Sequence, residues 1–199
     1  MAKLYFKYGA MGSSKTAQAL ITKFNYEERG MRVWLIKPST DTRDGADVVR
    51  SRIGLSAVCD VITPADDLFA RFCDGHDRDD VVIADEAQFF TPEQADQLFL
   101  VTVDLGIPVI CYGLRADFMM RGFPGSTRLL EIAHTIEELK TICACGRKAI
   151  CNGRKVNGEF VFEGAQVAID TVDDVEYQSL CPQCWYREYR AFLARHPKK

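Results

Sequence analysis

A short apolar run, a glycine-containing loop and a helical pattern follow one another at the start of this chain. Leu4-Tyr5-Phe6 has β-strand character, and the residues 9–16 read Gly-Ala-Met-Gly-Ser-Ser-Lys-Thr. The pattern that follows predicts a helix from about Ser14 to Glu28, which Gly30 ends. A loop that enters a helix in this way gathers backbone N–H groups at one spot, where an anion is stabilised. The order of these parts predicts a phosphate-binding loop between a strand and a helix.

The loop follows the pattern G-x-x-x-x-G-K-[ST] at all but one position. In this pattern the lysine contacts the β- and γ-phosphates, and the serine or threonine holds Mg²⁺. Gly9, Lys15 and Thr16 match, whereas Ser14 replaces the second glycine. The position tolerates serine if its backbone is already helical. The substitution weakens the evidence for a phosphate-binding loop without excluding one. Other segments of the chain are therefore needed to test the assignment.

Short apolar runs recur along the first 140 residues, with helical patterns after several of them. This alternation is typical of a mainly parallel sheet flanked by helices, as in P-loop proteins of the RecA-like kind. One later helix is predicted to begin with Thr91 as its cap, with Pro92 in the first turn and Gln94 completing a capping box. The segment 39–52 has little apolar content and is expected to be a loop. The expected strands are Leu4–Phe6, Val33–Ile36, Val58–Ile62, Val81–Ala84 and Val109–Tyr112.

An apolar strand pattern ends in two carboxylates at Asp85 and Glu86. In a phosphate-loop protein this is the strand expected beside the metal. The aspartate then assists the Mg²⁺ shell, and the glutamate takes a proton from a nucleophile. Taken alone, such a pair is more often a strand end with solvated acids. Together with the loop at Gly9–Thr16, it favours a site for phosphoryl transfer.

Five of the eight cysteines lie after residue 140. Cys143 and Cys145 form one close pair and Cys181 and Cys184 another, which is suited to a tetrahedral structural zinc site. The first pair is tighter than the common C-x₂-C spacing, so Cys151 competes as a ligand, and free thiols are the alternative to metal. The other cysteines lie singly in apolar surroundings and are expected in the core: Cys59, Cys73 and Cys111.

Composition restricts the class of protein further. The 199 residues carry a net charge of −3 and a pI of about 5.7, so no diffuse basic field favours a nucleic acid or an anionic membrane. The sequence has no signal-peptide pattern and no membrane-spanning run, and the expected compartment is the cytoplasm. From about Thr141 the chain changes to cysteines, glycines and short strand patterns. We therefore expect a P-loop nucleotide-binding core at residues 1–140 and a small zinc-binding domain with a C-terminal helix at 141–199.

These segments together resemble the type II thymidine kinases, the zinc-containing cytosolic, bacterial and phage family, over nearly the whole chain. The resemblance implies transfer of the γ-phosphoryl group of ATP, with Mg²⁺, to the 5′-hydroxyl of thymidine. It also implies a substrate-covering lasso, a structural Zn²⁺ and a homotetramer. The segments that carry the resemblance are Lys3–Phe6, the loop through Thr16, Asn25–Arg32, Ser51–Ser56, Asp85–Phe89, Cys111–Arg115 and Leu139–Cys143.

The resemblance also implies roles for single residues. Glu86 matches the family's catalytic base, and Asp41 and Arg43 match an acid and arginine near the reacting phosphate. ATP and its metal are expected at Gly9, Ala10, Met11, Gly12, Ser13, Ser14, Lys15, Thr16, Asp85, Glu86, Ala87 and Gln88. The nucleoside is expected at Met11, Asp41, Arg43, Phe89, Leu114, Phe118, Phe123, Ala168, Ile169, Asp170, Thr171, Val172 and Tyr177. The zinc ligands are expected to be Cys143, Cys145, Cys181 and Cys184.

One further departure from the family concerns base selectivity. The family's lasso has two glycines shortly before the tyrosine that Tyr177 matches, whereas this chain has Ala168–Asp174 without a glycine. The rival hypotheses are a kinase for deoxyuridine or another pyrimidine deoxynucleoside, and a catalytically silent ATP-binding module stiffened by zinc. Retention of Lys15 and Glu86 disfavours the silent module. A zinc-ribbon nucleic-acid binder is disfavoured by the acidic charge.

Overall fold

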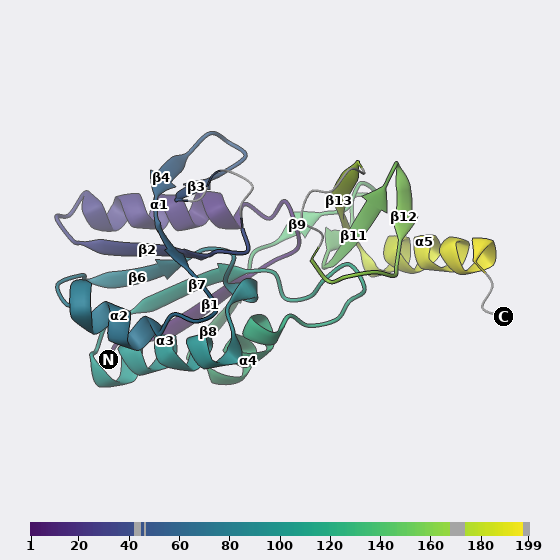
Figure 1. The fold of residues 1–199 in the computed structure, drawn as a ribbon. Helices are drawn as coiled ribbons and strands as arrows, with labels where there is room; N and C mark the ends of the chain where they lie inside the picture. The colour runs from purple at the N-terminus through teal and green to yellow at the C-terminus, as the bar shows by residue number, and fades with distance from the viewer. Residues whose placement is uncertain (42–44, 46, 168–173, 197–199) are drawn as a thin grey trace. The chain divides into compact units, whose positions relative to one another are not determined.

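A six-stranded sheet forms the centre of the first of two units into which contacts divide the chain (Figure 1). The computed structural model describes residues 1–41, 45, 47–167 and 174–196. All pairings in this sheet are parallel, which confirms the expected mainly parallel architecture. The strand order is β5-β2-β6-β7-β1-β8. The strands are β1 (Leu4–Tyr8), β2 (Val33–Pro38), β5 (Asp60–Ile62), β6 (Val81–Ala84), β7 (Val109–Gly113) and β8 (Thr135–Glu138).

The strand expected at Val58–Ile62 is wrong as a single element. The chain there forms β4 (Ser56–Val58) and then β5, and the two lie in different sheets. β4 pairs antiparallel with β3 (Val48–Arg50), which lies inside the segment expected to be a loop. Residues 48–50 form a strand rather than a loop because the hairpin of β3 and β4 buries an apolar side chain, that of Val49, which is only 3% exposed.

Helices cover both faces of the parallel sheet. In Figure 1, α1 (Lys15–Glu27) covers one face, and α2 (Leu68–Gly75), α3 (Pro92–Asp104) and α4 (Pro124–Ile132) cover the other. A single 3₁₀ turn, η1 (Ala87–Phe89), follows β6. The capping box of α3 is confirmed, because Thr91 and Gln94 exchange hydrogen bonds between side chain and backbone. Fully buried apolar side chains from strands and helices form the core of this unit, among them Phe6, Ile36, Phe72, Leu98 and Leu129.

The second unit contains two small antiparallel sheets and the last helix. β9 (Thr141–Ile142) pairs with β10 (Lys148–Ala149), and β11 (Cys151–Val156) lies between β12 (Glu159–Val161) and β13 (Val175–Leu180). Helix α5 (Pro182–Arg195) contributes Trp185 and Phe192 to a separate core. Two segments from earlier in the chain, Gly9–Ser13 and Ala116–Gly122, join this unit through their contacts.

None of the helices in the described part of the chain is both long and apolar enough for a membrane span.

Candidate functional site

The two carboxylates predicted at the end of β6 differ in environment. Asp85 is 3% exposed, and its N–H donates to the carbonyl of Ile36 at 3.0 Å. Burial and the negative charge of Glu86 raise the pKa of Asp85 to about 7, against the opposing effects of a Thr16 hydrogen bond and the Lys15 charge. Lys15 and Thr16 of the loop motif therefore lie beside Asp85. This arrangement brings a cation, a hydroxyl and an acid together at the carboxyl end of a parallel strand.

Glu86 is held in an uncommon backbone conformation. Its φ of 50° and ψ of 35° are left-handed, a region that costs a residue with a side chain roughly 1–2 kcal/mol. The amide of Gln88 donates to the Glu86 carboxylate. The other end of that amide, the Gln88 carbonyl oxygen, accepts the backbone N–H of Leu114 at 2.9 Å. Gln88 is 1% exposed, so the bridging side chain is buried, and it fixes the direction of the partly buried Glu86 carboxylate.

The 3₁₀ turn after Glu86 packs closely against the start of α4. A Cβ built on Gly125 would lie 2.4 Å from the carbonyl oxygen of Phe90 and 3.0 Å from that of Ala87, so only glycine fits. Phe89 and Phe123 meet edge to face, with ring centroids 5.6 Å apart. Among the predicted nucleoside residues, the structure brings these two rings together.

The predicted phosphate loop has two backbone features that explain its sequence. Gly9 allows a close approach, because a Cβ there would lie 2.5 Å from the carbonyl oxygen of Leu139. Ser14 has φ 59° and ψ 25°, so the condition stated for tolerating serine, a helical backbone at this position, is not met, and the helix begins at Lys15. The conformation is the left-handed one that glycine adopts without strain, and Ser14 adopts it as the residue before α1. Lys15 follows as the first residue of the helix and is 8% exposed.

A buried lysine holds the segment that contains Asp41. Lys37 is fully buried and donates to the carbonyls of Gly45 at 2.8 Å and Val48 at 2.9 Å. Its ammonium nitrogen lies 3.6 Å from a carboxylate oxygen of Asp41. The predicted partner Arg43 lies outside the described residues.

A buried arginine of β11 connects two of the predicted nucleoside residues in the second unit. Arg154 is 4% exposed, and its guanidinium lies 3.8 Å from the ring centroid of Phe118. Its Nε donates to the hydroxyl of Tyr177 at 3.0 Å. The two terminal nitrogens donate to the carbonyls of Ala165 and Gln166. Phe118 and Tyr177 are therefore brought together through one guanidinium.

The segment around Phe118 is fixed by two more contacts within this unit. The indole N–H of Trp185 donates to the Phe118 carbonyl at 2.9 Å. The carboxylate of Asp117 accepts backbone N–H groups of Met119 and Arg121. The predicted residues Ala168, Ile169, Asp170, Thr171 and Val172 lie outside the described part of the chain.

The four cysteines predicted to bind zinc form one cluster. The sulfur atoms of Cys143, Cys145, Cys181 and Cys184 all lie within 4.8 Å of one another, and the Cys145 and Cys181 sulfurs are 3.5 Å apart. A tetrahedral site with Zn–S bonds of about 2.3 Å places its sulfurs about 3.8 Å apart, so the cluster fits zinc. The Cys184 N–H lowers the pKa of the Cys181 thiol, while hydrogen bonds with the Cys145 and Cys181 thiols raise the pKa of Cys184, so these thiols share protons with one another.

The other cysteines divide into two groups. Cys59 and Cys111 are buried, as the sequence predicts, whereas Cys73 is exposed on α2 and that part of the prediction is wrong. Cys73 lies on the side of an amphipathic helix that faces away from the core residues Leu68 and Phe72. Cys151 contacts the sulfur of Met120 at 3.6 Å and is not part of the four-cysteine cluster.

Sequence reasoning missed several side chains that hold the predicted site residues. Each of them is a polar or charged residue in a strand or loop of otherwise ordinary composition, and each is buried in the structure. Lys37 gave such a signal, because a lysine follows four residues of an apolar strand. The residues missed are Lys37, Asp117, Asn152 and Arg154.

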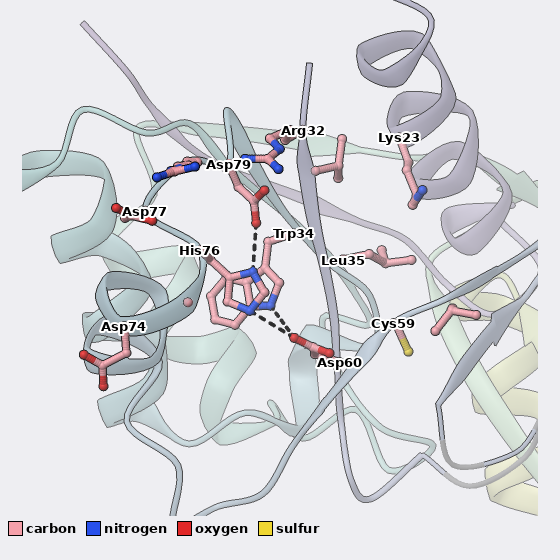
Figure 2. A pocket seen from close by; sticks show the side chains of 14 residues that line it. Lys23, Arg32, Trp34, Leu35, Cys59, Asp60, Asp74, His76, Asp77 and Asp79 are labelled. Atoms are coloured by element: carbon pink, nitrogen blue, oxygen red, sulfur yellow. Dashed lines mark hydrogen bonds and ion pairs between the residues drawn. The ribbon is translucent and has the colours of Figure 1, made fainter. Parts of the chain in front are cut away.

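A cavity of about 650 Å³ in the first unit lies along β2 and the end of α2 (Figure 2). None of the predicted site residues lines it. His76 stacks on Trp34 there, with centroids 4.3 Å apart, and its two ring nitrogens face Asp60 and Asp79. Basic and acidic side chains both line the cavity, so its charge does not select a phosphate group.

Comparison with known proteins gives consistent results along the chain. Residues 2–185 match the family described as thymidine kinase. A thymidine kinase of Ruegeria pomeroyi is 45% identical over 93% of this chain and 94% of its own length. A thymidine kinase of Francisella tularensis is 40% identical over 93% of this chain and 97% of its own length. The thymidine kinase of Enterobacteria phage T4 is 43% identical over 93% of this chain and 96% of its own length.

Proposed function

Because this chain belongs to the thymidine kinase family, we propose that it transfers the γ-phosphoryl group of ATP to the 5′-hydroxyl of thymidine, forming thymidine monophosphate. The observation that supports this most directly is the placement of Glu86, which follows β6 and is oriented by Gln88. A carboxylate held in one direction is what a general base requires.

Glu86 accepts the proton of the 5′-hydroxyl as that oxygen attacks the γ-phosphorus. Its left-handed backbone turns the chain directly after β6, and the bridge to Gln88 limits the movement of its side chain. Phosphoryl transfer needs little covalent help from a protein, and most of the acceleration comes from positioning and electrostatics. The bridge from Glu86 through the buried Gln88 side chain to Leu114 supplies the positioning at the acceptor side.

The loop Gly9–Thr16 binds the phosphates of ATP through backbone N–H groups, and Lys15 places a positive charge on the β- and γ-phosphates. The Thr16 hydroxyl and the Asp85 carboxylate offer the oxygen ligands that Mg²⁺ prefers, and their contact supports a metal-side role for both. When bound, Mg²⁺ neutralises charge on the transferring phosphate.

The family resemblance assigns the thymine contacts to Met11, Phe89, Leu114, Phe118, Phe123 and Tyr177. Main-chain groups of the lasso complete these contacts in the family, and the segment 168–174 replaces its glycines here. We expect looser discrimination of the thymine methyl group, because a pocket rejects a missing methyl by only roughly 1–3 kcal/mol. Deoxyuridine is then a slower acceptor, whereas purine nucleosides are excluded by size.

Zinc bound by the four-cysteine cluster stabilises the second unit. The cluster links the turn after β9 with the first turn of α5, and the core between these elements is small. We assign zinc a structural role, since four cysteine ligands leave no open position for a substrate.

Three further properties are proposed, the first and third from the sequence itself and the second from the family resemblance. We propose a kinase core at residues 1–140 with a zinc-binding domain at 141–199, a homotetramer, and a location in the cytoplasm. Clustered cysteines that bind metal rather than forming disulfides are typical of a reducing compartment, which supports the location.

A nucleoside panel tests the proposed activity. Purified protein is incubated with ATP, Mg²⁺ and thymidine, deoxyuridine, deoxycytidine or deoxyguanosine, and the monophosphates are separated and counted. We expect the highest kcat/KM for thymidine and a lower, measurable value for deoxyuridine. A preference for a purine nucleoside would remove the thymidine assignment, and no nucleoside-dependent ATP consumption would favour the silent ATP-binding module.

A further inference from the structure

Three consecutive peptide groups of the segment Gly9–Ser13 are hydrogen-bonded by side chains of the second unit, to which this segment belongs. The Met11 N–H donates to the side-chain oxygen of Asn152 at 2.8 Å. The Ser179 hydroxyl donates to the Met11 carbonyl. The Thr141 hydroxyl donates to the Gly12 carbonyl at 3.3 Å.

Each of these bonds fixes a different peptide plane. In a planar trans peptide the N–H and the C=O point in opposite directions, so holding one group directs the other. The bond from Ser179 to the Met11 carbonyl therefore directs the N–H of Gly12 away from Ser179. The Met11 N–H and the Ala10 carbonyl belong to one peptide group. The bond from this N–H to Asn152 therefore directs the Ala10 carbonyl away from Asn152, and there it accepts the Ser13 N–H at 3.3 Å. The directions of the loop's N–H groups thus depend on these side chains.

Asn152 and Ser179 are themselves fixed by the sheet. They lie opposite each other in the register of β11 and β13. Asn152 is 4% exposed, and its amide nitrogen donates to the carbonyl of Ala116 at 2.8 Å. One orientation of the amide satisfies both partners, with the oxygen accepting from Met11 and the nitrogen donating to Ala116. The sheet therefore presents a rigid pair of hydrogen-bonding groups to the loop.

From these contacts we propose that Asn152 and Ser179 are positioning residues for ATP. They hold the peptide groups on either side of Met11 so that the loop's N–H groups are arranged for phosphate before ATP arrives. The affinity for ATP then depends on two strands of the zinc-containing unit. This inference rests on the proposed function, because it takes Gly9–Thr16 as the phosphate-binding loop.

Two single variants and a matched control test the inference. Asn152→Leu removes both amide contacts at similar volume, and Ser179→Ala removes one hydroxyl. The control, Tyr177→Phe, removes a hydroxyl from the same strand as Ser179 without touching the loop, since that hydroxyl accepts from Arg154. The dissociation constant of ATP is measured by calorimetry, and KM for ATP and for thymidine by steady-state kinetics. Zinc content and thermal unfolding are recorded for each protein.

We expect the ATP dissociation constant to rise about 5- to 100-fold in Asn152→Leu, which leaves the partly buried Met11 N–H without its acceptor. Ser179→Ala is expected to raise it about 3- to 10-fold, the usual range for one hydrogen bond. In both variants KM for ATP rises more than KM for thymidine, and zinc content is unchanged. In Tyr177→Phe the order is reversed, and KM for thymidine changes more than KM for ATP.

ATP affinity within twofold of wild type in both loop variants would overturn the inference. Equal losses for ATP and thymidine would also overturn it, because Asn152 and Ser179 would then act on the fold or on the thymine contact of Met11 rather than on the phosphate-binding N–H groups. If Asn152→Leu does not fold, the result for Ser179→Ala decides alone. A wild-type protein that binds ATP without phosphorylating any nucleoside would remove the proposed activity, while the ATP affinities would still decide this inference.

Discussion

Gln88 offers a sharp test of how the proposed base is oriented. Its side chain bridges the Glu86 carboxylate and the backbone N–H of Leu114, and it is 1% exposed. Gln88→Leu keeps a similar volume and removes both hydrogen bonds. The Leu114 N–H then has lost its buried acceptor, which costs about 1–3 kcal/mol of unfolding free energy. For a chain of this length, that loss lowers the unfolding temperature by roughly 2–12 °C.

The effect on turnover is expected to be separate from the effect on stability. Once the amide no longer fixes Glu86, the carboxylate samples directions that cannot reach the 5′-hydroxyl. A misplacement of about 1 Å can cost on the order of 100-fold in rate, so we expect kcat to fall by about 10- to 100-fold. KM for ATP should stay within about threefold, because both ends of the Gln88 side-chain amide are engaged by Glu86 and Leu114 rather than directed at the phosphate loop.

A second variant reaches the same bridge from the other side. A Cβ on Gly113 would lie 2.9 Å from the side-chain oxygen of Gln88 and 3.1 Å from its backbone nitrogen. Gly113→Ala should therefore displace Gln88 and lower kcat in the same direction. The assay is thymidine phosphorylation under saturating substrates, at a temperature at which circular dichroism shows each variant folded. If kcat of folded Gln88→Leu is within twofold of wild type, Gln88 does not orient the base and the reasoning fails.

Three further predictions concern the cysteines and the loop. Elemental analysis should find one Zn²⁺ per chain in wild type and in Cys151→Ser, and none in Cys145→Ser; zinc retained in Cys145→Ser but lost in Cys151→Ser would contradict the ligand set. Burial raises the pKa of Cys59 to about 11 and of Cys111 to about 12. At pH 8 both thiols are therefore protonated, and mass spectrometry should find iodoacetamide on exposed Cys73 and not on these two, with reaction of Cys59 rising as the pH approaches 11. Ser14→Gly should raise the unfolding temperature by no more than a few degrees and leave KM for ATP within about twofold, because glycine adopts the same left-handed backbone with less strain; a large change in that KM would show that the serine side chain itself has a role.

Local sequence signals predicted the elements that depend on neighbouring residues. The capping box at Thr91 and Gln94 involves residues three apart, and the structure has both of its hydrogen bonds. The strand Val81–Ala84 is a continuous apolar run that is buried on both faces, and its bounds are those expected.

Features that depend on distant residues were not predictable in the same way. The strand expected at Val58–Ile62 divides because Val58 pairs with Val48 while Asp60 pairs with Ile36. Nothing in the local pattern says that these partners belong to different sheets. The left-handed conformation of Ser14 was not predictable from the sequence, because position 14 lacks glycine, the residue that usually indicates this conformation.

The side chains that support the site could not be predicted from the sequence, for a related reason. Asn152 acts on Met11 across 141 positions of sequence, and it is an ordinary polar residue in its own segment. Its partner becomes visible only after β11 and β13 have paired. The residues proposed to react were predicted from motifs, whereas the residues that contact them in the structure depend on tertiary pairing.

The central claim is that Glu86 takes the proton of the 5′-hydroxyl. The most direct measurement compares wild type with Glu86→Gln in a single-turnover experiment with radiolabelled ATP and saturating thymidine, together with the dissociation constant of ATP. The amide keeps the shape and cannot accept the proton, so we expect the rate of thymidine monophosphate formation to fall by about 10²- to 10⁴-fold while ATP affinity changes little. A rate within a few fold of wild type in a correctly folded variant would contradict the role of Glu86 and the mechanism built on it.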